Sequence, residues 1–157
     1  MRRRLVLILL AVAAIMVVAA PSASAAGAGA VSFTQTEHNA TETDTDVNPC
    51  TGAPGTLTLT YNAIFHVTTL ANGTYWATFT QTGTFSFVPF DSSQPSYTGH
   101  FMVWDGDNWN NQNTTETATF MVIGTGSDGS MLAFHETEHF SVSATGVTTS
   151  FDNPRCG

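Results

Sequence analysis

The sequence contains no lysine, and three of its four basic residues are arginines at positions 2–4. If this N-terminal segment is removed, Arg155 faces 12 Asp and Glu residues, which gives a net charge of 1 − 12 = −11. Nucleic acids and anionic membranes are held by Lys and Arg side chains. The composition therefore argues against both partners and leaves a small apolar or a cationic ligand.

Cysteine is equally scarce, since Cys50 and Cys156 are the only two. They form no C-x-x-C motif, so neither a redox pair nor a zinc site is expected. In an exported chain, two cysteines near the two ends of the ordered part predict a disulfide. Closing a loop of about 100 residues constrains the unfolded chain by about 4 to 5 kcal/mol in the entropy model.

Helical periodicity with end caps is missing throughout the chain, and so are several catalytic motifs. The sequence has no nucleophile elbow, no P-loop and no dinucleotide-binding glycine pattern. We therefore predict no cofactor, no metal site and no assignable catalytic residue.

The N-terminal segment of the chain contains a long apolar run. Met1 and three arginines precede sixteen apolar residues, Leu5–Ala20, and a small-residue A-x-A site follows. This arrangement predicts a secretory signal peptide over residues 1–26 and a secreted, extracellular product; a retained membrane anchor is the alternative. The remaining residues, 27–157, suit one domain with a disordered tail over 27–30 and no membrane contact after cleavage.

Threonine makes up about one residue in five beyond position 26 and alternates with aliphatic and aromatic residues. A period of two predicts β-strands. We expect the acidic run 41–46 and residues 105–113 to lie outside the strands, a type I′ turn at Asn72-Gly73, and a bend or bulge at Gly83. The expected strands cover 31–38, 56–68, 75–87, 97–104, 115–123, 131–143 and 147–151.

Seven or eight antiparallel strands with short turns predict an all-β fold. Because several strands span ten or more residues, we expect a single up-and-down β-barrel, with a β-sandwich as the alternative. The disulfide would tie the chain's end to the loop after the first strand, where the first and last strands meet to close the sheet.

Five short segments carry a resemblance to known proteins: residues 48–52 (NPCTG), 82–87 (TGTFSF), 97–101 (YTGHF), 124–129 (GTGSDG) and 151–157 (FDNPRCG). On these segments the sequence resembles a group of uncharacterised small exported actinobacterial β-barrel proteins. The resemblance implies export and an all-β fold, and it brings no activity with it. In architecture alone, the strand plan also resembles lipocalins and allene-oxide-cyclase-type barrels.

Residues 135–139 spell H-E-x-x-H, which binds zinc when it lies on a helix. The surrounding sequence predicts a strand instead, and there His135 and His139 stand about 13 Å apart, too far for one zinc ion. Burying the apolar residues of this strand turns Glu136 and Glu138 inward, about 7 Å apart. A bulge or an open barrel end that exposes both glutamates is the alternative.

The first strand repeats this pattern, because residues 33–38 (FTQTEH) align with residues 134–139 (FHETEH). The alignment predicts that Gln35 and Glu37 join Glu136 and Glu138 in a polar cluster inside the barrel, although two short strands can also match by chance. A concave apolar site with a few polar groups is typical of small-molecule binding. The other expected lining residues are Tyr61, Phe65, Tyr75, Phe79, Gln81 and Phe101.

This cavity predicts a protein that binds a small, mainly apolar ligand in its interior. Two alternatives remain open: an isomerase or cyclase that uses an interior carboxylate as general acid or base, and a filled barrel that acts as a structural or surface-interaction module. Trp104 and Trp109, which flank Asp and Asn residues, indicate either a sugar-stacking pair or a solvated loop.

Overall fold

The computed structural model describes residues 29–110 and 112–157. The predicted signal peptide over 1–26 and the first two residues of the predicted tail lie outside these residues, and Gly29 and Ala30 have no regular structure. Within these ranges all regular structure is β-strand. No helix there is long and apolar enough to span a bilayer.

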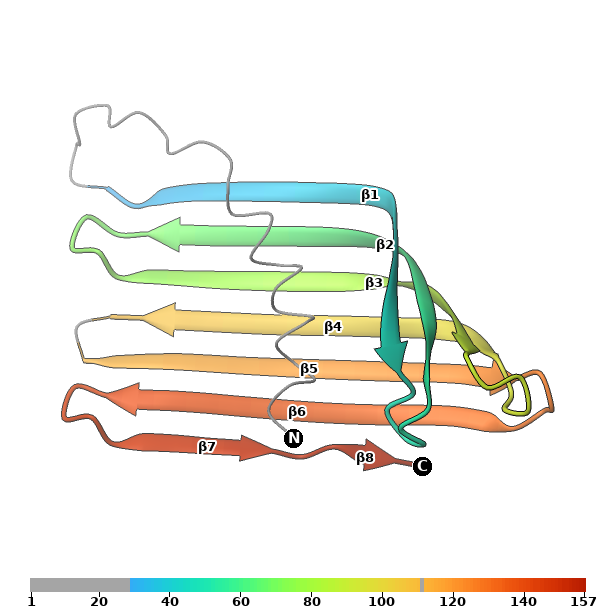
Figure 1. Cartoon of the computed structure of the whole chain (residues 1–157). Coiled ribbons are helices and arrows are strands. Elements are labelled where there is room, and N and C mark those ends of the chain that lie inside the picture. Colours follow the sequence, from blue (N-terminus) through green and yellow to red (C-terminus); the bar gives the residue numbers. More distant parts are fainter. Residues whose placement is uncertain (1–28, 111) are drawn as a thin grey trace.

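Eight antiparallel strands form one sheet (Figure 1). Strands that are neighbours in sequence are neighbours in the sheet from β1 to β7, and β8 pairs with β6 beyond the end of β7. This order confirms the predicted all-β, up-and-down architecture. The strands are β1 (Val31–Val47), β2 (Pro54–Thr69), β3 (Tyr75–Pro89), β4 (Tyr97–Trp109), β5 (Asn113–Gly126), β6 (Met131–Ser143), β7 (Thr148–Asp152) and β8 (Arg155–Cys156).

Two stretches that we expected to be loops are strands. The acidic run 41–46 continues β1, because its threonines pair with those of β2 in an unbroken ladder. Residues 105–109 complete β4, where Asp107 pairs with Ala77 on one side and Glu116 on the other. Pairing with neighbouring strands thus outweighs the low strand propensity of Asp and Asn.

The hairpin between β2 and β3 forms at the predicted place, but the prediction of a type I′ turn is wrong. A type I′ turn needs positive φ at both central residues. Only Gly73 has it, with φ of 83°. Gly73 N donates to Leu70 O at 2.9 Å, and Thr74 N donates to Asn72 Oδ1 at 3.0 Å. The Asn72 side chain therefore supports a longer loop.

Strand β1 bends sharply about half way along its length (Figure 1). Its register with β2 shifts between Glu37 and Ala40, and Asn39 has a φ of 51°. Asn accepts this left-handed conformation more readily than most residues. The Asn39 backbone N–H donates to Asn62 Oδ1 at 3.1 Å. Beyond this bulge, the second half of β1 and the first half of β2 fold across the sheet toward β6 and the C-terminus (Figure 1).

A disulfide between Cys50 and Cys156 fixes the tip of this folded-over hairpin. The two residues are separated by 106 positions, and their Cα atoms lie 5.8 Å apart. Cys156 also pairs with Phe134 in the ladder between β8 and β6. The predicted disulfide is confirmed. In the described part of the chain β1 and β7 share no ladder, so the disulfide, and not a first-to-last strand pairing, links the two ends of the sheet.

The hydrophobic core lies between the folded-over hairpin and the sheet. Gly83 lets the chain approach closely here, because a Cβ at this position would lie 2.1 Å from Thr60 O. The register between β2 and β3 does not shift at Gly83, so this position is not a bulge. The buried members of the core are Phe85, Phe87, Tyr97, Phe101, Val122, Leu132 and Phe134.

Candidate functional site

The cross-strand register assigns each strand residue to one face of the sheet, because paired residues point the same way. We call the face that carries the core residues Phe101, Val122 and Phe134 the inner face, and the opposite face the outer face. Phe101 pairs with Val122, which pairs with Phe134. The folded-over hairpin covers part of the inner face (Figure 1).

Ten of the 12 carboxylates share the inner face. Asp91 and Asp128 are the other two and lie in turns. The outer face is rich in threonine, and its residues in the described strands include no Asp or Glu. The acidic charge of the sheet is therefore concentrated on one side, at Glu37, Glu42, Asp44, Asp46, Asp105, Asp107, Glu116, Glu136, Glu138 and Asp152.

A cavity of about 720 Å³ opens between the inner face and the folded-over hairpin. Much of its wall is apolar, with contributions from Leu57, Leu59, Phe85, Phe101, Val122 and Phe134. Its acidic side chains are Asp46, Glu116, Glu136, Glu138 and Asp152. Asp46 belongs to the folded-over hairpin, whereas the other four belong to β5, β6 and β7.

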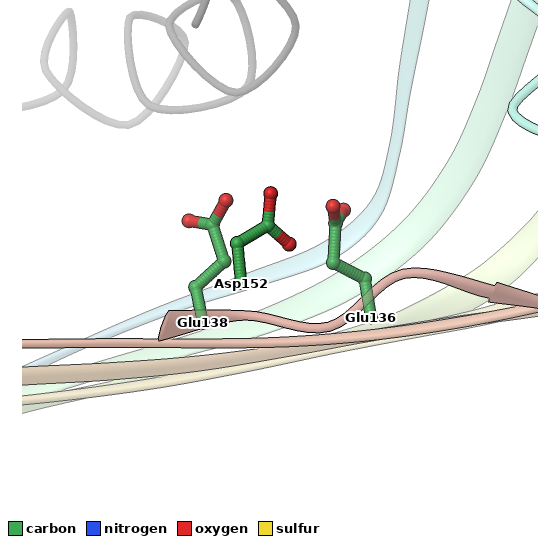
Figure 2. Close-up of side chains that lie close together, drawn as sticks. All are labelled: Glu136, Glu138 and Asp152. Carbon is green, nitrogen blue, oxygen red and sulfur yellow. The ribbon is translucent and has the colours of Figure 1, made fainter. Parts of the chain in front are cut away.

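Three of these carboxylates form a cluster. Glu136, Glu138 and Asp152 project from neighbouring strands to the same side (Figure 2). One carboxylate oxygen of each lies within 4.8 Å of those of the other two. Glu138 and Asp152 stand directly opposite each other in the ladder between β6 and β7. Oxygen donors arranged in this way suit a cationic group, either an ammonium or a hard metal ion.

Burial and the repulsion of neighbouring carboxylates raise the pKa values of Glu138 and Glu116. Burial raises the pKa of Glu138, and the carboxylates of Asp152 and Glu116 raise it further. The pKa of Glu116 is raised by burial and then by Asp107. The described part of the chain holds a single Lys or Arg, Arg155, and it pairs with His135 on the outer face. No basic side chain of the sheet therefore offsets this repulsion on the inner face.

Asp105 has the most strongly raised pKa of these acids. Burial raises its pKa to about 7, with further contributions from Asp107 and Glu116. Its Oδ2 atom is buried and has no hydrogen-bond partner among the described residues. The pKa of Asp107 is also raised by burial. Asp105 and Asp107 lie beside the cavity on the inner face and add to its negative potential.

Four of the ten residues predicted to bind a ligand line the cavity: Gln81, Phe101, Glu136 and Glu138. The two glutamates face inward, as the strand prediction required. The other six share the inner face but are not part of the cavity wall, namely Gln35, Glu37, Tyr61, Phe65, Tyr75 and Phe79.

Gln35 and Glu37 lie on β1, five strands away from β6 in the order of the sheet. Glu37 instead accepts a hydrogen bond from Tyr61. The pKa of Tyr61 is raised by burial first, and then by the charges of Glu37 and Glu42 and by this hydrogen bond.

The histidines of the H-E-x-x-H sequence lie on the outer face. His135 pairs with Met121, and His139 pairs with Thr117, whose Oγ1 lies 2.8 Å from His139 Nδ1. Glu136 therefore points to the opposite side of the sheet from both histidines. The motif lies on a strand, as predicted, and its residues do not converge on one zinc ion.

Sequence reasoning missed seven acids of the inner face: Glu42, Asp44, Asp46, Asp105, Asp107, Glu116 and Asp152. A signal existed for Asp105 and Asp107, which continue the alternation of Tyr97, Phe101 and Val103 in β4. This alternation was not followed past Trp104, because residues 105–113 were predicted to form a loop. No such signal existed for Asp46, because the bulge in β1 reverses the alternation before it.

Trp104 and Trp109 lie on opposite faces of the sheet. Trp109 stacks on Tyr75, with ring centroids 6.1 Å apart and an interplanar angle of 14°. Trp104 lies on the outer face against Gly106, where a Cβ would be 2.8 Å from its Cη2 atom. The two side chains therefore do not form one sugar-stacking platform.

Comparison with protein-family models, with curated proteins and with solved structures finds no match. The resemblance to small exported actinobacterial proteins stays a prediction, and the function is argued from the site alone.

Proposed function

We propose that the protein is an exported binding protein for a small molecule with an apolar body and a cationic group. The observation that carries this proposal is the cavity of about 720 Å³, whose wall combines core aromatic residues with the Glu136, Glu138 and Asp152 cluster. Cavities of about 300–1,000 Å³ with a few convergent polar groups are typical of small-molecule sites. The disulfide is compatible with an oxidising, extracellular location, and the N-terminal sequence supports export.

The charges of the cavity favour a cationic group. Two pairs of carboxylates stand directly opposite each other on the inner face, Asp107 with Glu116 and Glu138 with Asp152. Like charges in such positions destabilise a sheet. A bound ammonium relieves this repulsion, whereas a neutral group does not and an anionic group increases it. The apolar wall binds the body of the ligand by removing its surface from water.

Binding of three matched probes tests the proposal: octylammonium, octanol and octanoate, each below its aggregation concentration. Calorimetric titration at pH 8 and constant ionic strength should show the tightest binding for octylammonium, weaker binding for octanol and the weakest for octanoate. Equal affinities for the three, or no binding of octylammonium, would show that the proposal is wrong.

A double variant, Glu136→Gln with Glu138→Gln, separates the cationic group from the apolar body. We expect it to weaken octylammonium binding by about 10-fold or more, or about 1.4 kcal/mol, and to leave octanol binding within about 2-fold. The matched control is Asp91→Asn with Asp128→Asn, which removes the same charge from two turns outside the cavity. This control should leave the binding of both probes unchanged.

Filling the cavity tests the site of the apolar body. Ala118 lines the cavity between the acidic and the aromatic parts of the inner face. We expect Ala118→Leu to weaken octanol and octylammonium to a similar extent, because the larger side chain takes the volume of the alkyl chain. Unchanged octanol binding in a folded Ala118→Leu protein would place the alkyl chain elsewhere.

The pH dependence of binding distinguishes the acidic cluster from a general surface effect. The raised pKa values of Glu138 and Glu116 mean that these side chains lose protons over a higher pH range than ordinary glutamates. We therefore expect octylammonium affinity to rise between pH 5 and pH 8, with no matching change for octanol. A flat profile for octylammonium would count against an interaction with these carboxylates.

A further inference from the structure

On the outer face, soft side chains interrupt the threonine-rich pattern where β4, β5 and β6 run side by side (Figure 1). Along one row of this face, Met102 on β4 pairs with Met121 on β5, and Met121 pairs with His135 on β6. The preceding member of the row is Thr82 on β3, as the threonine pattern predicts. Two thioethers and an imidazole thus occupy three successive positions across the sheet.

Met121 is the central member of this row and has Met102 and His135 as its direct neighbours on either side. Directly opposite residues in an antiparallel ladder have Cβ atoms about 4.5–5.5 Å apart. Methionine has three rotatable bonds, so the sulfur of Met102 is able to lean toward Met121 at the centre of the row. His100 lies two residues before Met102 on the same face and is a diagonal neighbour of Met121, at about 7–8 Å between backbones.

The imidazoles at this place differ from the other paired histidines of the outer face. Threonine hydroxyls lie within hydrogen-bond distance of the rings of His66 and His139. In the described part of the chain, the rings of His100 and His135 make no hydrogen bond, and both side chains are exposed to solvent. Met102 and Met121 are half-buried. Two imidazole rings are therefore accessible beside two partly desolvated sulfur atoms.

We propose that Met102, Met121 and His135, with His100 as an additional donor, form a binding site for monovalent copper, Cu(I). Thioether sulfur is a soft ligand that selects Cu(I), and imidazole also suits copper. Hard divalent ions such as Ca²⁺ and Mg²⁺ require oxygen ligands. The carboxylates of the sheet lie on the inner face, so the sheet separates the soft donors from the hard ones. The site is on the opposite face from the cavity and does not depend on the function proposed for that cavity.

Competition with the chromophoric chelator bicinchoninate measures Cu(I) binding. The full exported chain is used with its disulfide intact, and ascorbate keeps the copper monovalent. We expect one Cu(I) per protein molecule. X-ray absorption of this complex should show both sulfur and nitrogen ligands, and an excess of Ca²⁺ should not displace the copper. A copper shell of oxygen and nitrogen without sulfur would overturn the proposal.

The double variant Met102→Leu with Met121→Leu keeps the volume of both side chains and removes both sulfur atoms. We expect it to weaken Cu(I) binding by at least about 100-fold, or about 2.7 kcal/mol. Met131→Leu is the matched control, because Met131 also lies on the outer face of β6 but pairs with Thr125 outside the cluster. The control should bind Cu(I) as the natural chain does.

The urea midpoint of each variant shows whether it is folded. If the double variant does not fold, the single variants Met121→Leu and His135→Gln replace it, each with an expected loss of about 10-fold or more. Unchanged Cu(I) affinity in folded variants would show that the proposal is wrong. Loss of Cu(I) binding in the Met131→Leu control would place the copper elsewhere on the outer face and overturn this assignment.

Discussion

Glu138 on β6 and Asp152 on β7 stand directly opposite each other on the inner face, and both line the cavity. Two like charges in this position repel each other unless a cation or a proton intervenes. Asp107 and Glu116 repeat this arrangement on β4 and β5. Repulsion between these carboxylates therefore destabilises the unliganded sheet, and a bound cation reduces this repulsion. The stability of the protein is in this way linked to its proposed function.

Removing one charge of the first pair should stabilise the unliganded protein. We expect Asp152→Asn to raise the free energy of unfolding at pH 8 by about 0.5 kcal/mol, because the repulsion of Glu138 disappears. Urea denaturation measures the change. Asp44→Asn is the control, since Asp44 lies on the same face opposite Leu57 and should give no such gain. A loss of stability in Asp152→Asn would mean that Asp152 makes a stabilising contact.

The stability of the unliganded protein should fall as the pH rises from about 4 to 7. The pKa of Asp105 is raised from 3.8 to about 7 in the folded protein, so over this window the folded state holds a proton that the unfolded state has lost. The raised pKa values of Asp107, Glu116 and Glu138 act in the same direction. After allowance for solvent screening, we expect Asp105 alone to account for about 1–2 kcal/mol.

Urea denaturation between pH 4.5 and 8 measures this fall, and Asp105→Asn should make it smaller because the variant no longer titrates at that position. Stability that rises with pH across this window would contradict the raised pKa values. An equal slope in the variant would assign the effect to the other inner-face acids.

Loss of the disulfide should release the folded-over hairpin. The bond between Cys50 and Cys156 closes a loop with a sequence separation of 106, for which the entropy model gives about 4 to 5 kcal/mol. We expect the double variant Cys50→Ser with Cys156→Ser to lose stability of this order in urea denaturation. It should also bind octanol more weakly, because Leu57 and Leu59 leave the cavity wall. A loss below about 1 kcal/mol would mean that packing alone holds the hairpin.

The bulge at Asn39 should be sensitive to branching at Cβ. Its φ of 51° is tolerated by Asn and Gly but is strained for a β-branched residue. We expect Asn39→Val to lower the free energy of unfolding by about 1–2 kcal/mol, and Asn39→Gly to change it by less than about 0.5 kcal/mol. Thermal or urea denaturation of the two variants provides the comparison. Equal stabilities would show that the backbone at this position adjusts without cost.

Much of the fold could be predicted from the sequence because the relevant information is local. Alternation of threonine with apolar residues marks strands and assigns their two faces, which is why β6 (Met131–Ser143) has the predicted bounds and Glu136 and Glu138 face inward. The boundaries of β1 and β4 were missed, because acidic and Asn-rich segments have low strand propensity and are held in the sheet by their neighbours.

The sequence by itself determined the all-β fold, the disulfide pair and the inward direction of Glu136 and Glu138, since each depends on the period of two or on a count of residues. Only the tertiary structure decided how the strands align. The bulge at Asn39 reverses the alternation of β1 and brings Asp46 to the inner face, and the register of β4, β5 and β6 places Met102, Met121 and His135 in one row. Register depends on contacts between distant segments, and a shift of one residue moves every side chain of a strand to the other face.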